Sequence, residues 1–437
     1  MNQPGLRRFH HKSAAGSQGD DKGCPYPLLR CEPPICDGTS SPVKNLQPDL
    51  AERRLRRRGA LLMLYFLFQA EFGLAWDRSW HDYLGRDQFW IPPHIMSYTG
   101  IGVTGLVVLM LVLIETVRYY QRKPGVDASS TICVLRVFAA PQGFIMLGFG
   151  TLTDLIAAPL DNYWHRLYGI DVTLWSPFHL LGLTGSIFAG VGLIYVFASE
   201  AVIARTSEHV PRRWLGLNGP EWMALFFFAV LIALSFIGLT AFKPVVLNAV
   251  PVITYPAALA FPAAFCLSGA VQLTRKVGSA CLVALFVWGI ALLMQIFVSW
   301  ALHASSTFWH ILFRYDHEPV LNVIFMALPI YFLLCALLID GVFSWQNRKK
   351  RAMNALQNAW LIGLLTAIMA AFVPTGIARL LYLLVPGLAF PPDVSQALLI
   401  DTTWPTLLWN LPLTLLVGLA SALAGSALGA KWYWNKS

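Results

Sequence analysis

The chain has 437 residues, of which 56% are hydrophobic and only 13% are charged, and its formal net charge is +9. Repeated apolar runs of about 20 residues, long enough to cross the hydrocarbon core of a bilayer, exclude a soluble globular protein and predict an all-α, polytopic transmembrane bundle. No basic surface interleaved with aromatic residues is visible, so we expect membrane lipid, and no nucleic acid, around the chain.

Residues 1–58 are polar, proline-containing and basic, and lack the apolar core of a cleavable signal, so they predict a solvent-exposed tail. The seven cysteines, three of them in this tail, show neither a zinc spacing nor an obvious disulfide framework. Hydropathy then predicts ten transmembrane helices, at 59–76, 93–117, 137–160, 177–204, 221–240, 246–271, 278–302, 319–343, 359–385 and 405–430.

Orientation follows from the basic residues of the short connecting segments, because basic segments are retained in the cytoplasm. One side of the predicted bundle holds 20 lysines and arginines. The other side holds five, namely Arg78, Arg86, Arg166, Lys243 and Arg314. Both termini are therefore expected to be cytoplasmic.

The first extracytoplasmic segment, DRSWHDYLGRDQFWIPPH at 77–94, is rich in ionisable residues, and the next one, DNYWHRLYGIDVTLWSPFH at 161–179, repeats its pattern. Each copy has an Asp, a His four residues later preceded by Trp, and a second His after a proline-containing turn. The repeated residues are Asp77, His81 and His94 in the first copy, and Asp161, His165 and His179 in the second. The shared order indicates an internal repeat.

Each copy has the donor set of a metal site. Asp and His at positions i and i+4 project from one face of a helical turn, so an oxygen and a nitrogen can converge on one ion. The prolines start a new helix with His94 or His179 in its first turn, where the helix dipole disfavours imidazolium and leaves the ring able to bind metal. Asp87 and Asp171 are candidates for orienting an imidazole or shuttling a proton.

Two other interpretations of these segments compete with a metal site. Trp, Tyr, His and Asp gather at any membrane interface, but an ordered pattern that occurs twice favours a functional site. Histidines 13 or 14 residues apart on one helix can bind two haems, yet Pro92, Pro93 and Pro177 interrupt such a helix. One oxygen and two nitrogens suit non-haem iron, copper or zinc.

Both copies resemble the C subunit of the particulate methane and ammonia monooxygenases, the copper membrane monooxygenases. The residues that carry the resemblance are Asp77, Trp80, His81, Arg86, Asp87, Phe89, Pro92 and His94 in the first copy, and Trp164, His165, Pro177 and His179 in the second. The resemblance covers residues 60–205 and marks the chain as a distant or enlarged relative. Asp161 departs from it, because the family has Asn there.

The resemblance implies copper, rather than iron or zinc, at Asp77, His81 and His94 and at Asp161, His165 and His179. It also implies O2 activation to hydroxylate a small-molecule substrate, and further monooxygenase subunits as partners. The expected location is a bacterial plasma (inner) membrane, with both motifs on the extracytoplasmic side. The alternative function is membrane copper transport or metal-site assembly, but neither motif contains Cys, the ligand that soft Cu(I) prefers.

The expected domains are the tail at 1–58, a four-helix metal-binding core at 59–205 and an additional six-helix bundle at 206–437. A third Trp-His pair lies in the last of these, in the segment 303–319, which contains His303, His310 and His317. It is either a third copy or lid that contributes ligands, or ordinary interfacial decoration. Within the apolar helices, Glu71 and Asp154 precede the motif aspartates by one to two turns and are candidates for proton supply or for helix-packing hydrogen bonds.

Overall fold

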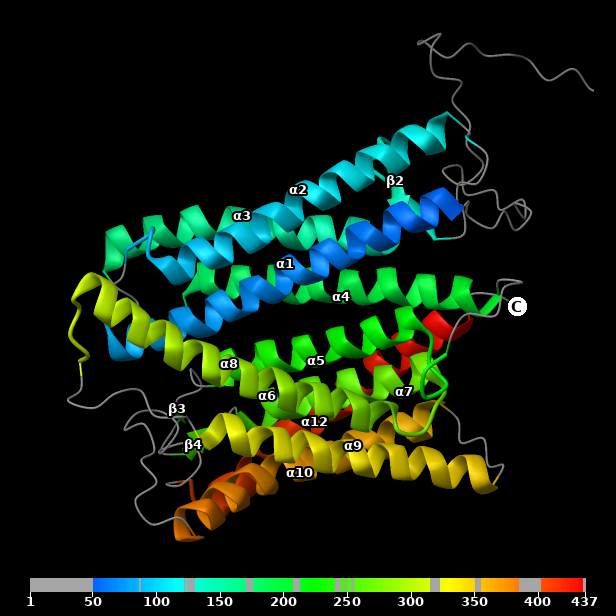
Figure 1. The fold of residues 1–437 in the computed structure, drawn as a ribbon. Coiled ribbons are helices and arrows are strands. Elements are labelled where there is room, and N and C mark those ends of the chain that lie inside the picture. The colour runs from blue at the N-terminus through cyan, green and yellow to red at the C-terminus, as the bar shows by residue number, and fades with distance from the viewer. Residues whose placement is uncertain are drawn as a thin grey trace, which may run out of the picture. The chain divides into compact units, whose positions relative to one another are not determined.

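The computed structural model of the protein describes the main chain of residues 50–85, 88–121, 123, 130–169, 176–206, 213–239, 245–247, 250–252, 255–314, 323–349, 355–384 and 402–434. Ten spans in this part of the chain are helical, long and apolar enough to cross a membrane, which confirms the predicted all-α, multi-pass class. Their helices run roughly alongside one another (Figure 1).

The first four spans are single helices, α1 (Leu50–Tyr83), α2 (Pro92–Tyr120), α3 (Gln142–Tyr168) and α4 (Pro177–Thr206). They are followed by α5 (Gly219–Leu239) and by a sixth span built from α6 (Tyr255–Pro262), the π-helix η1 (Ala263–Leu267) and α7 (Ser268–Thr274). The last four spans are α8 (Ser279–Trp309), α9 (Val323–Lys349), α10 (Ala355–Leu384) and α12 (Trp404–Trp434).

Two short antiparallel hairpins replace the expected starts of two helices. Strands β1 (Thr131–Val134) and β2 (Phe138–Pro141) pair with Thr131 opposite Pro141, so the third span begins at Gln142 and not at 137. Strands β3 (Val245–Leu247) and β4 (Val250–Val252) pair ahead of the sixth span, which begins at Tyr255 and not at 246. Hydropathy does not separate an apolar strand from an apolar helix, which explains both differences.

The first helix is longer than its apolar run at both ends. It begins at Leu50 rather than 59, because its basic first turns are neutralised inside the protein: Arg56 donates two hydrogen bonds to Glu115 of α2, at 3.0 and 2.9 Å, and also pairs with Glu52. It ends at Tyr83 rather than 76, and α3 ends at Tyr168 rather than 160. The first Asp and His of each motif therefore lie on the last turns of a long helix and not in a loop.

Neighbouring helices of the first half pack in pairs, α1 on α2 and α3 on α4, and the pairs meet through α2 with α3 and α1 with α4. A single cluster of buried apolar side chains extends from Ala60 in α1 to Trp432 in α12. The helices of residues 59–205 and those of 206–437 therefore share one hydrophobic core, with α12 packed against α4, α7 and α10.

Among the cysteines that the structure describes, one differs from the sequence-based expectation. Cys266, Cys281 and Cys335 are free thiols, whereas Cys133 in β1 is disulfide-bonded. Cysteine pairing depends on distances between segments that are remote in the sequence, so spacing alone did not indicate it.

One end of the bundle, on the left of Figure 1, holds the C-terminal ends of α1, α3 and α8 together with the N-terminal ends of α2 and α4. The motif residues of both copies thus occupy one end, and the ion pairs around Arg56 occupy the opposite end of α1. We call these the triad end and the basic end.

The basic end is predicted to face the cytoplasm, and single-cysteine labelling tests this. Thr307 near the triad end and Asn347 near the basic end are both exposed. In a cysteine-free background, a cysteine at position 307 is expected to react with an impermeant maleimide added outside, and a cysteine at 347 only after permeabilisation, because basic residues are retained inside. Labelling at 347 in intact cells would overturn this orientation.

Candidate metal centre

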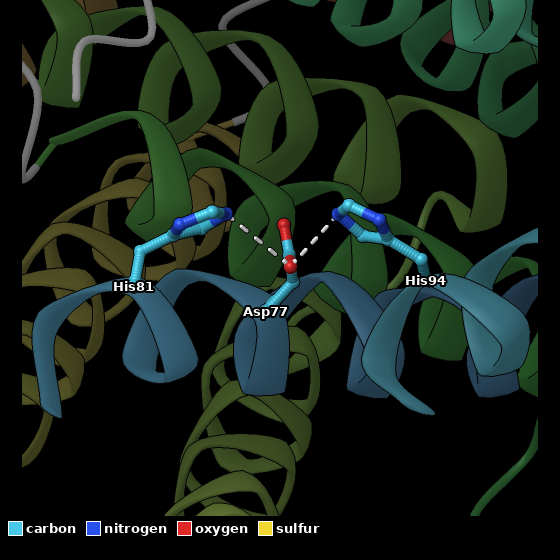
Figure 2. A group of neighbouring side chains, drawn as sticks. All are labelled: Asp77, His81 and His94. Carbon is cyan, nitrogen blue, oxygen red and sulfur yellow. Dashed lines mark ion pairs between the residues drawn. The ribbon is translucent and has the colours of Figure 1, made fainter. Parts of the chain in front are cut away.

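The first Asp-His-His set is assembled from the end of α1 and the beginning of α2. Asp77 and His81 lie one turn apart on α1, and His94 lies in the first turn of α2, which Pro92 and Pro93 begin. Nε2 of His94 is 3.0 Å from Oδ1 of Asp77, and Nε2 of His81 is 3.6 Å from the same oxygen. Figure 2 shows the carboxylate between the two imidazole rings. We call these three residues the first triad.

The second triad repeats this geometry at the junction of α3 and α4. Nε2 of His165 and Nε2 of His179 each lie 3.2 Å from Oδ2 of Asp161. Ser176 precedes Pro177 and caps α4, because its hydroxyl oxygen accepts the backbone N–H of His179 at 3.1 Å. The same hydroxyl donates to Oδ1 of Asp161 at 3.4 Å, so the residue that starts α4 also holds the carboxylate.

The imidazoles are oriented by backbone carbonyls. Nδ1 of His94 lies 3.3 Å from the carbonyl oxygen of Phe89, and Nδ1 of His165 lies 3.3 Å from that of Gly169. A carbonyl only accepts, so the proton in each contact belongs to Nδ1. In a neutral ring this leaves the Nε2 lone pair facing the carboxylate, which is the tautomer that binds a metal.

The donor atoms of each triad fit a metal ion. In each set, one carboxylate oxygen and two imidazole nitrogens all lie within 4.8 Å of one another. In the first triad, Oδ1 of Asp77 is buried and accepts no hydrogen bond of normal geometry, although two imidazole nitrogens are near it. Lone pairs that face one another repel unless a cation lies between them, and the set of one oxygen and two nitrogens suits copper, iron or zinc.

The two triads interact with each other. Asp77 of the first triad interacts electrostatically with His179 of the second, and Asp161 of the second with His94 of the first. The charge on one set therefore affects the other, which is the arrangement expected if the repeated motifs build neighbouring sites.

The remaining predicted site residues lie elsewhere or outside the described residues. Asp87, Asp171 and His317 fall outside the part of the chain that the structure describes. His303 and His310 are exposed at the end of α8 and belong to neither triad. Glu71 of α1 and Asp154 of α3 are buried six and seven residues before the triad aspartates.

The end of α1 is held by a segment that the motifs did not reveal. The backbone N–H of Arg314 donates to the carbonyl of Tyr83 at 2.7 Å, and its guanidinium donates to those of His81 and Gly85 at 3.2 and 3.3 Å. Arg314 thus satisfies carbonyls at a helix C-terminus, where a positive charge is also favoured by the helix dipole. In the sequence it was only one of five basic residues on that side, and nothing near it in the chain pointed to α1.

A glycine ends the helix in each copy, which extends the repeat beyond its polar residues. Gly85 has φ +69° and Gly169 has φ +86°, and each lies eight residues after its triad aspartate. A left-handed residue of this kind stops a helix with little strain only if it is glycine. The same eight-residue spacing from aspartate to glycine is visible in the sequence, and it predicts where both helices end.

Replacing these glycines by alanine separates backbone strain from the Arg314 contact. Both variants are expected to lose on the order of 1–3 kcal/mol, because each glycine has a positive φ that other residues rarely adopt. A Cβ at Gly85 would also lie 1.8 Å from Nε of Arg314, whereas one at Gly169 has no neighbour within 4 Å. Gly85→Ala therefore also loses hydrogen bonds of about 1 kcal/mol each. Thermal unfolding in detergent measures the difference, and equal shifts would contradict a role for Arg314.

Comparison of the chain with protein-family models, with curated proteins and with solved structures finds no match. The function is therefore inferred from the residues of the two triads and from the resemblance of their motifs.

Proposed function

We propose that the protein is a copper-binding integral membrane protein that acts as a membrane monooxygenase, or as its metal-bearing subunit, and activates O2 to hydroxylate a small substrate. The observation that carries the proposal is the convergence of one carboxylate oxygen and two imidazole nitrogens in each of two interacting triads at one end of a membrane bundle. The order of the motif residues, which is similar to that of the copper membrane monooxygenase C subunit, favours copper over iron or zinc.

The surroundings of the first triad suit a small, uncharged substrate. Trp76, beside Asp77, forms edge contacts with Trp80 and Phe297, whose ring centroids lie 6.2 and 5.9 Å away. Trp80 is buried and contacts Trp309 of α8 in the same way, at 6.3 Å. This aromatic cluster packs the end of α1, which carries Asp77 and His81, against α8, and apolar surroundings of this kind exclude water and favour the binding of apolar molecules.

The residues of the chain have distinct tasks in this proposal. Asp77, His81 and His94 would hold one copper ion and Asp161, His165 and His179 a second, and bound copper supplies the ability to react with O2. The carbonyls of Phe89 and Gly169 orient the imidazoles, and Ser176 orients Asp161. The triad end faces the extracytoplasmic side of a bacterial plasma membrane, and further monooxygenase subunits are the proposed partners.

Metal analysis of the purified protein tests the proposal. We expect copper in the purified protein, with up to two ions per chain, and hydroxylation of a small apolar substrate once a reductant is supplied. Iron or zinc in place of copper, or a full haem spectrum, would contradict it. Copper that is carried into vesicles without any turnover of substrate would instead indicate the transport function.

A further inference from the structure

Two carboxyl groups are buried in the interior of the first four helices, apart from the triads. Glu71 of α1 and Asp154 of α3 have only 7% and 5% of their surface exposed, and they interact electrostatically. Oε2 of Glu71 and Oδ1 of Asp154 are buried and have no hydrogen-bond partner. The hydroxyl of Ser186 donates to Oδ2 of Asp154 at 3.2 Å. We call Glu71 and Asp154 the buried acid pair.

This pair differs from the other buried carboxylates of the same helices, each of which has an arginine. Glu115 receives two hydrogen bonds from Arg56, which also pairs with Glu52. Glu200 lies 3.8 Å from Arg53. Among the residues that the structure describes, no Arg, Lys or His pairs with Glu71 or Asp154, so the first four helices neutralise their other buried carboxylates but leave these two without a cation.

Two ionised carboxylates cannot remain together in such surroundings. Transfer of one unpaired charge into an apolar interior is already strongly unfavourable, and repulsion from a second like charge adds to the cost. A single proton relieves both, because it removes one of the two charges and with it their repulsion. The oxygens without partners are the acceptors that such a proton requires.

A glycine in α4 leaves room for the carboxyl group of Asp154. A Cβ at Gly185 of α4 would lie 2.4 Å from Oδ1 of Asp154, so only glycine leaves room for the carboxyl group at that point. Asp154 lies seven residues before Asp161 on α3, and Ser186 lies seven residues after His179 on α4. Two residues separated by seven positions lie on the same face of a helix, about 10 Å from each other along its axis. Asp154 and Ser186 therefore lie on the same helix faces as Asp161 and His179 of the second triad.

We propose that Glu71 and Asp154 form a proton-binding site in which at least one of the two carboxyl groups carries an exchangeable proton, about two helical turns inside the membrane from the triads. The site stores a proton next to the metal centre, on the face of α3 and α4 that leads to Asp161 and His179. Reduction of O2 at copper consumes protons, so the use of this site in O2 chemistry rests on the proposed function. The existence of the proton-binding site does not depend on that function.

Infrared spectroscopy of the full-length, metal-free protein tests the site directly. We expect a C=O stretching band of a protonated carboxyl group that shifts on exchange into D2O. The band should disappear in the double variant Glu71→Gln, Asp154→Asn and should persist in Glu115→Gln, whose carboxylate is ionised against Arg56. Identical spectra for the wild type and the double variant would overturn the proposal. Absence of the band, with thermal stability that rises on addition of sodium, would show that a cation is bound instead.

A stability measurement gives a second readout that needs neither metal nor turnover. An amide resembles a protonated carboxyl group in shape and strands no charge, so Glu71→Gln and Asp154→Asn are expected to unfold near the wild-type temperature. Glu115→Gln is expected to unfold at a clearly lower temperature, because Arg56 loses a charged partner. A large loss of stability in both amide variants of the pair would indicate an ionised pair and refute the site. Copper content is measured separately. A protein without copper would refute the proposed function but would leave the proton-binding site untouched.

Discussion

His81→Ala and His94→Ala are each expected to remove copper from the first triad, with a fall in affinity of at least about 100-fold. Loss of groups that only orient a metal ligand costs roughly 10–100-fold, and a ligand contributes more. Each variant leaves one carboxylate and one imidazole, too few donors to hold copper against solvent. Metal analysis and the copper absorption or paramagnetic resonance spectrum measure the result, and total copper should fall by one ion per chain.

The matched control for this experiment is His310→Ala. His310 is exposed at the end of α8 and belongs to neither triad, so its removal should leave the copper content unchanged. Loss of copper in His310→Ala together with retention in His81→Ala would place the metal outside the first triad. Unchanged copper in both triad variants would show that Asp77, His81 and His94 form only ion pairs and hydrogen bonds.

Asp161→Asn is expected to lower the copper affinity of the first triad as well as that of its own. Asp161 interacts electrostatically with His94, so the negative charge it contributes favours a cation at both sets. A unit charge at several Å in a medium of low dielectric constant is worth on the order of 1 kcal/mol or more, which corresponds to about a tenfold change in affinity. Copper titration in a His165→Ala, His179→Ala background isolates the first triad and measures this effect.

The control for the charge change is Asp340→Asn in α9. Asp340 is buried and accepts the backbone N–H of Cys281 at 2.9 Å, and it belongs to neither triad. The same loss of one negative charge there should leave the copper affinity of the first triad unaltered. An equal fall in both variants would assign the effect to net charge, and no fall in either would mean that the triads act independently.

The order and number of the membrane spans were predictable from the sequence because hydropathy is a local property of each segment. The spacing of Asp77 and His81, or of Asp161 and His165, was equally informative, since residues four apart meet on any helix. Pro177 likewise indicated the beginning of α4. These inferences need only the regular geometry of one segment, and the choice of copper stays a prediction that a metal measurement must decide.

Other features depend on contacts between segments remote in the sequence. The basic first turns of α1 are helical because Glu115 lies opposite Arg56, and the end of α1 is held by Arg314 from beyond α8. The buried acid pair exists only because the packing of the first four helices buries both Glu71 and Asp154 inside the bundle. Apolar periodicity reports that a helix has a buried face but not which helix covers it. The tertiary structure alone therefore decided which charges of the first four helices are neutralised and which two of their buried carboxyl groups have no cation.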